Sequence, residues 1–122
     1  MNGSIPILRI GEILVASVQT ELRDRVANAF QEDVLNTLET TGATGLVIDI
    51  SGLEVVDTYV ARVLAETGQM AKLMGASTVL VGMRPEIAAT LIRMAYPMGG
   101  IDTALNLQEG LALFGRRKKK KK

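Results

Sequence analysis

The sequence predicts a single α/β domain: a mainly parallel sheet of four or five strands, opened by an N-terminal hairpin and covered by four helices. Its 122 residues are 48% hydrophobic, which is enough for one packed core. After residue 40, short apolar segments alternate with longer amphipathic ones, as in strand–helix–strand units with parallel strands. Before residue 20, a Gly-Glu pair separates two short apolar segments, which indicates a hairpin.

The hairpin is expected to comprise a first strand within residues 5–10 and a second strand over Ile13–Val18. The two strands join at Gly11-Glu12. Pro6 has no backbone N–H to donate to a neighbouring strand. We therefore expect the first strand to lie at an edge of the sheet or to begin after this proline.

An amphipathic helix is predicted from about Glu21 to Thr40. Apolar residues recur there at every fourth position among Asp, Glu and Arg, so that they form one stripe on a helix: Leu22, Val26, Phe30, Val34 and Leu38. Gly42 stands where this helix should end, because glycine readily adopts the left-handed conformation found after a helix.

The central strand and a second helix follow. Leu46–Ile50 is apolar except for Asp49, as expected for a strand with both faces covered. The second helix begins at Thr58 and ends at Gly75. Its inward side is expected to carry Val60, Val63, Leu64, Ala71 and Met74. The core of the domain should include Leu46, Ile48, Ile50, Val63, Leu64 and Val81.

The remaining elements continue the alternation. Thr78–Val81 is an apolar strand, and Pro85 suits the first turn of a third helix with inward residues Ile87, Leu91 and Met94. Ile101–Leu105 is a last short strand. Asn106 and Glu109 have the spacing of a capping box at the start of a fourth helix. Three methionines within the helical patterns are expected to fill the core: Met70, Met74 and Met94.

The composition excludes several kinds of chemistry. Cysteine and histidine are both absent, which removes disulfides, thiolate chemistry, Ser-His-Asp and Cys-His catalysis and histidine-based zinc sites. No apolar run approaches the roughly 20 residues of a membrane span, and the N-terminus does not resemble a signal peptide. These absences are compatible with a cytosolic protein, and we expect neither an enzyme nor a need for a metal or cofactor.

Charge is distributed unevenly along the chain. Arg116–Lys122 holds seven of the fourteen basic residues, which leaves seven basic and thirteen acidic residues before it, a net charge of −6. No aromatic stacking platform accompanies this basic run, so nucleic-acid binding is not expected. We expect residues 1–115 to form the domain and residues 116–122 to form a flexible, solvated tail.

Asp57 and Thr58 place an acid and a hydroxyl where the apolar run Leu53–Val56 gives way to the second helix. One interpretation is helix capping, in which one of the two accepts a backbone hydrogen bond worth about 1 kcal/mol. The other is function, because α/β folds place their sites at the carboxyl ends of parallel strands. Two more classes stay open: an anion-binding module that uses the helix starts at Thr58 and Pro85, and a hydrolase built only from carboxylates.

The motif DISGL at Asp49–Leu53, followed by VVDT at Val55–Thr58, resembles the signature of STAS domains, the anti-sigma-factor antagonist family. The resemblance extends along the chain up to Phe114. Within the family, the helix start at Tyr59–Val63 and the short stand-alone length most resemble the small scaffold proteins of the bacterial stressosome.

This resemblance implies a scaffold that binds a switch-type serine/threonine kinase and releases it on phosphorylation, relaying stress signals to a downstream regulator in the cytoplasm. It implies co-assembly with RsbR-type paralogues into a large hetero-oligomer. The acceptor hydroxyl falls on Thr58, where many relatives carry serine; threonine keeps the nucleophilic oxygen, but its branched Cβ restricts its rotamers. Asp57 and Tyr59, with the Ser51-Gly52 turn, are expected to form the partner surface. The nearest alternative is a sporulation-type antagonist that binds an anti-sigma kinase.

Overall fold

Five strands and four helices make up the computed structural model, which describes residues 5–18, 22–94 and 101–120. The strands are β1 (Ile7–Ile10), β2 (Ile13–Ser17), β3 (Gly45–Asp49), β4 (Ser77–Val81) and β5 (Ile101–Ala104). The helices are α1 (Asp24–Thr41), α2 (Thr58–Leu73), α3 (Pro85–Met94) and α4 (Leu107–Lys120).

All five strands belong to one sheet, in the order β1-β2-β3-β4-β5. The β1 strand pairs antiparallel with β2, and the three other pairings are parallel. The predicted hairpin and mainly parallel sheet are therefore confirmed. So is the expectation for the first strand, because β1 lies at an edge and begins directly after Pro6.

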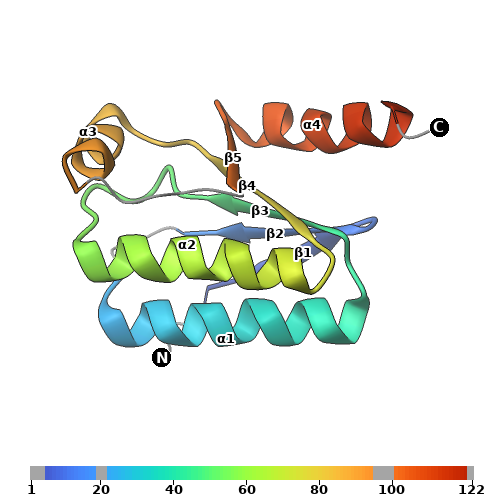
Figure 1. The fold of residues 1–122 in the computed structure, drawn as a ribbon, viewed down its shortest axis with the longest axis horizontal. Coiled ribbons are helices and arrows are strands. Elements are labelled where there is room, and N and C mark those ends of the chain that lie inside the picture. The colour runs from blue at the N-terminus through green and yellow to red at the C-terminus, as the bar shows by residue number, and fades with distance from the viewer. Residues whose placement is uncertain (1–4, 19–21, 95–100, 121–122) are drawn as a thin grey trace.

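The helices lie in two layers around the sheet. In Figure 1, α1 and α2 run side by side under one face, whereas α4 lies on the opposite side. The α4 helix contacts β3, β4 and β5, so it covers only part of its face. The α3 helix follows the carboxyl end of β4 and lies at that end of the sheet.

The core has two parts because β3 is covered on both faces. Leu46 and Ile48 point toward α1 and α2, where they join the large cluster that includes Phe30. Val47 points to the other face, in a smaller cluster that packs against α4. This two-sided burial explains why β3 reads as a nearly continuous apolar run. All six predicted core residues are buried, with exposed fractions between 0% and 4%.

The first helix begins later than its apolar stripe. Leu22 is buried, yet α1 starts only at Asp24, three residues after the predicted start at Glu21, which lies outside the described residues. A residue can enter the core from a non-helical segment, so periodicity overestimates the length of the helix. At the other end the prediction is confirmed, since Gly42 caps α1 in the left-handed conformation.

The prediction that methionines fill the core is wrong for Met70 and Met74, which are 41% and 45% exposed. The buried face of α2 is instead lined by smaller residues, including Val63, Leu64 and Ala71. Met74 follows the last residue of the helix, so the helical spacing no longer determines its direction. The side chain of Met94 lies outside the described residues; of its predicted companions, Ile87 is buried and Leu91 packs against the core.

The fourth helix continues past the predicted end of the domain. Its start is as expected, because the Glu109 N–H donates to Asn106 Oδ1 at 2.9 Å. However, α4 extends to Lys120, so residues 116–120 of the expected flexible tail are helical. Lysine is a good helix former, and positive charge is favourable at a helix C-terminus. Among the described residues, no helix is long and apolar enough to cross a membrane.

Candidate functional site

The candidate site lies at the carboxyl edge of the sheet, in the segment that joins β3 to α2. After β3, the Leu53 N–H donates to the Ile50 carbonyl at 2.9 Å and closes a turn. Leu53 and Val56 are then buried, whereas the intervening Val55 is 67% exposed. The apolar run after the DISG motif is therefore no strand. It is a short connection anchored by two buried side chains. The start of α2, which follows it, is exposed at the surface.

Asp57 caps α2. Its backbone is extended, and its Oδ1 accepts a hydrogen bond from the Val60 N–H at 2.8 Å. Its carbonyl accepts the first helical hydrogen bond, from the Ala61 N–H. The capping interpretation is thus correct for the acid, which leaves the hydroxyl next to it without this task.

Replacement of Asp57 tests this role. We expect Asp57→Ala to lower the free energy of unfolding by about 0.5–2 kcal/mol, because an N–H of the first turn loses its acceptor. Asp57→Asn should be nearly neutral, because asparagine caps about as well. Urea denaturation measures both. Equal losses in the two variants would show that the charge of Asp57, rather than its hydrogen bond, supports the helix.

Thr58 is the first residue of α2, and its side chain is exposed. Its hydroxyl makes no hydrogen bond to any part of the chain that the structure describes. Four other helical threonines donate to the carbonyl four residues earlier: Thr37 to Asp33, Thr41 to Thr37, Thr67 to Val63 and Thr90 to Glu86. At the first helical position no preceding turn offers such a carbonyl. The Thr58 hydroxyl therefore points to solvent, available to a partner.

Tyr59 links the start of α2 to the neighbouring helix. Its hydroxyl donates to Asn28 Oδ1 of α1 at 2.7 Å. The guanidinium of Arg62 lies over its ring, 5.2 Å from the ring centre. This half-buried ring, next to Thr58, is thus contacted from two sides.

The Ser51-Gly52 turn is held by the connection between β4 and α3. Asp49 Oδ1 accepts from the Ser51 N–H at 2.9 Å, and Arg84 Nε donates to the Ser51 carbonyl at 3.0 Å. Gly82 has a φ of +75°, and a Cβ atom at this position would come within 2.8 Å of Ser51 Cβ. The end of β4 therefore packs directly against this turn.

The structure places all five predicted site residues at one edge of the sheet. Asp57, Thr58 and Tyr59 open α2, and Ser51-Gly52 follow β3. Sequence reasoning assigned no role to Asn28, Arg62 or Arg84, three polar residues that hold parts of this edge. Only Arg62 carried a signal, since it stands one helical turn beyond Thr58. The other two approach from distant segments.

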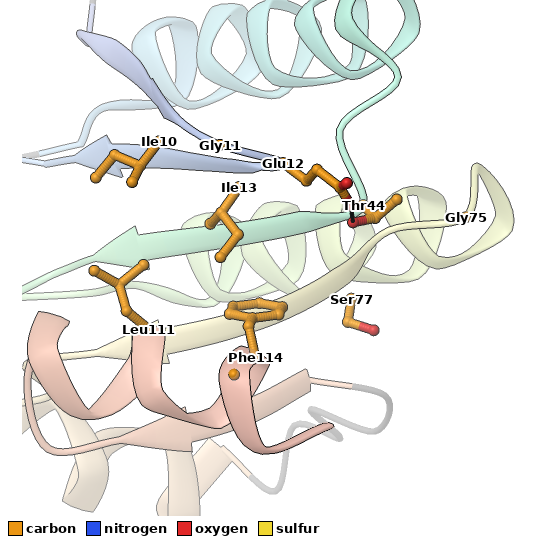
Figure 2. Close-up of a pocket in the computed structure, with 10 residues that line it drawn as sticks. Ile10, Gly11, Glu12, Ile13, Thr44, Gly75, Ser77, Leu111 and Phe114 are labelled. Carbon is orange, nitrogen blue, oxygen red and sulfur yellow. Dashed lines mark hydrogen bonds between the residues drawn. The ribbon is translucent and has the colours of Figure 1, made fainter. Parts of the chain in front are cut away.

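A groove of about 1010 Å³ lies at the opposite, amino edge of the sheet (Figure 2). Its apolar lining includes Ile10 and Ile13 from the hairpin and Leu111 and Phe114 from α4. Its polar rim includes Thr44, whose hydroxyl donates to Glu12 Oε1. In the described ranges, no group of three or more acidic, histidine or cysteine side chains could hold a metal. The groove and Thr58 therefore lie at opposite ends of the parallel strands.

Comparisons with known proteins place the chain in a family. The STAS domain family matches residues 4–104. The structure of RsbS from Moorella thermoacetica with a serine-to-glutamate substitution is 40% identical, with a TM-score of 0.84 over 94% of this chain and 97% of that one. A chain from the structure titled as the molecular architecture of the stressosome, a signal integration and transduction hub, is 38% identical, with a TM-score of 0.76 over 93% and 98%.

Longer relatives match as well. The RsbT co-antagonist protein RsbRA of Bacillus subtilis (strain 168) is 34% identical over 98 residues, which is 80% of this chain. The match spans only 34% of RsbRA, so this chain corresponds to about a third of that relative. The fold, the DISGL and VVDT motifs and these matches agree: the chain belongs to the STAS domain family.

Proposed function

We propose that this protein is a stressosome scaffold that holds a switch-type serine/threonine kinase and releases it when Thr58 is phosphorylated. The released kinase then acts on a downstream regulator. The scaffold itself performs no catalysis and needs no cofactor. In this proposal Thr58 accepts the phosphate, while Asp57, Tyr59 and the Ser51-Gly52 turn shape the surface that the kinase contacts.

The observation that carries the proposal is that Asp57, and not Thr58, caps α2. Asp57 caps the helix, so the hydroxyl of Thr58 has no structural task and is exposed at the first helical position. A kinase needs an accessible hydroxyl on a backbone of defined conformation. The Asp57 cap stabilises the helical conformation of the turn that carries Thr58. The Tyr59–Asn28 hydrogen bond links the surface beside it to α1.

We propose that the partners include RsbR-type paralogues, in a large hetero-oligomer. The likeness to RsbS and to a chain of the stressosome supports this, as does the similarity to RsbRA. An acidic body with a net charge of −6 repels copies of itself. Pairing with a paralogue of different surface charge relieves that repulsion and favours mixed assemblies.

The experiment mixes the chain with an RsbR-type paralogue and a switch kinase from the same genome. Light scattering after gel filtration should show a particle of megadalton size that contains the kinase. After ATP is added, the kinase should leave the particle, and mass spectrometry of peptides should place the phosphate on Thr58. Truncation after residue 115 should leave assembly intact, because the last packed apolar residue is Phe114.

Two results would contradict the proposal. A chain that stays a small monomer with every paralogue would favour the sporulation-type antagonist, which binds an anti-sigma kinase without a scaffold. Phosphate found only at other residues would reduce Thr58 to an ordinary first-turn residue. Loss of the particle on truncation would instead assign the basic tail a role in assembly.

A further inference from the structure

Arg62 lies one turn of α2 beyond Thr58. The four-residue spacing puts both residues on the same strip of the helix, with Cβ atoms about 5–6 Å apart. Helical side chains lean toward the N-terminus of their helix. Arg62 does so, because its guanidinium lies over the ring of Tyr59, 5.2 Å from the ring centre. The positive charge is thereby held in the turn that carries Thr58.

This arginine has no partner stronger than the ring. Among the described residues it makes neither an ion pair nor a hydrogen bond. Glu66 is four residues further along the helix, in the less favourable order for an ion pair, with the cation first. The ring stays in place without the arginine, because the Tyr59 hydroxyl is bonded to Asn28 at 2.7 Å. The donors of Arg62 are therefore free for a new acceptor.

We propose that Arg62 binds the phosphate of phosphorylated Thr58 and leaves the Tyr59 ring to do so. The inference rests on the proposed role of Thr58 as acceptor. A phosphate carries about −1.5 to −2 charges and three acceptor oxygens. A guanidinium matches its geometry with two parallel hydrogen bonds, which are stronger than an exposed contact with an aromatic face. Here the anion precedes the cation by four residues, which is the favourable order.

Phosphorylation then changes two features of the partner surface together. It neutralises the charge of Arg62, and it uncovers the face of the Tyr59 ring. Both changes occur on exposed or half-buried side chains, so the backbone of α2 stays as it is. A partner that docks on the Tyr59–Arg62 pair loses its binding surface, although its contacts elsewhere are untouched.

The test uses the full chain with phosphothreonine built in at position 58 by semisynthesis, so that no kinase is required. Phosphorus NMR follows the second ionisation of the phosphate against pH. The midpoint of this ionisation should lie about 0.3 pH units lower in the phosphorylated chain with Arg62 than in the phosphorylated Arg62→Gln variant. The reason is that the guanidinium stabilises the dianion. Arg62→Lys should restore part of the difference, since it keeps the charge and loses the planar fork.

Lys72→Gln is the matched control. It removes the same charge from the same helix, about 15 Å from Arg62 at 1.5 Å per residue, and its midpoint should equal that of the unchanged chain. Proton NMR of the Tyr59 ring gives a second readout: phosphorylation should shift the ring signals in the unchanged chain and not in Arg62→Gln.

The inference would be overturned if the phosphate titrated with the same midpoint with and without Arg62. It would also be overturned if the Tyr59 ring signals did not shift on phosphorylation. Such a failure would leave the proposed function intact, because kinase release does not require this pairing. Conversely, if the kinase never modifies Thr58, the proposed function is wrong. The semisynthetic protein would still show whether Arg62 binds a phosphate on Thr58.

Discussion

Thr58→Ala should hold the kinase in the assembly after ATP is added, whereas the unchanged chain should release it. The variant lacks the hydroxyl that accepts the phosphate, so release should fall to the background of a sample without ATP. The fold should be unaffected, because the Thr58 side chain is exposed and without a hydrogen bond in the described structure. This is the largest functional effect that we expect from one substitution.

The phosphate should act on partner contacts and leave the fold of the domain almost unchanged. At the start of α2, the helix dipole favours the added charge by about 0.3–1 kcal/mol. Repulsion from Asp57 opposes it by roughly 1 kcal/mol per charge pair at about 4 Å in water. These terms nearly cancel and are small beside a typical domain stability of about 5–15 kcal/mol. At an interface, in contrast, desolvating the dianion costs several kcal/mol, which one exposed cation beside it does not offset.

Gel filtration of the assembly with bound kinase measures the outcome. Thr58→Ser should behave like the unchanged chain, since it keeps a hydroxyl at the same place. Thr58→Glu should fold normally and bind the kinase differently, although a carboxylate carries less charge than a phosphate. Thr44→Ala is the matched control: it removes another exposed threonine, at the opposite edge of the sheet. Release of the kinase from Thr58→Ala on ATP addition would refute the assignment.

Ile48→Ala should produce the largest loss of stability, about 2–5 kcal/mol in the free energy of unfolding. Ile48 is fully buried in β3, the central strand of the sheet, where its register partners are Ala16 of β2 and Leu80 of β4. Truncation leaves a cavity between the sheet and the helices α1 and α2, and these elements can close it only in part. A loss of this size approaches the whole stability of a marginal domain.

The control makes the same truncation at the surface. Ile92 of α3 is 80% exposed, so Ile92→Ala should change the free energy of unfolding by no more than about 0.5 kcal/mol. Urea denaturation of both variants gives the comparison. Similar effects at the two positions would contradict the placement of β3 at the centre of the core.

The sequence alone determined most of the fold. Apolar residues with a period of two or nearly continuous runs predict strands, and those with a period near four predict helices. Leu46, Ile48 and Ile50 were correctly assigned to the core, because a strand in the middle of a covered sheet has no polar face. The glycine after α1 was correctly assigned as its end, because its conformational freedom is a property of the residue itself.

Errors arose where a helix ends or where burial was assumed from residue type. Met70 and Met74 are apolar and occur in a helical pattern, yet they are exposed, because the space beneath α2 is already filled by Val63, Leu64 and Ala71. The helical continuation of α4 past residue 115 does not follow from the sequence pattern, because a basic run has no apolar period that would mark it as a helix.

Part of the candidate site could likewise be predicted from the sequence, and part depends on the tertiary structure. Asp57 and Thr58 could be picked out from the sequence, because an acid and a hydroxyl before an apolar helix are local signals. The sequence left open which of the two is the cap; only the backbone geometry assigns it to Asp57 and leaves Thr58 exposed. The contacts of Tyr59 with Asn28 and of Ser51 with Arg84 join residues more than 30 positions apart. Such pairs exist only after the strands align and the helices pack, because local patterns carry no information about which distant side chains will meet.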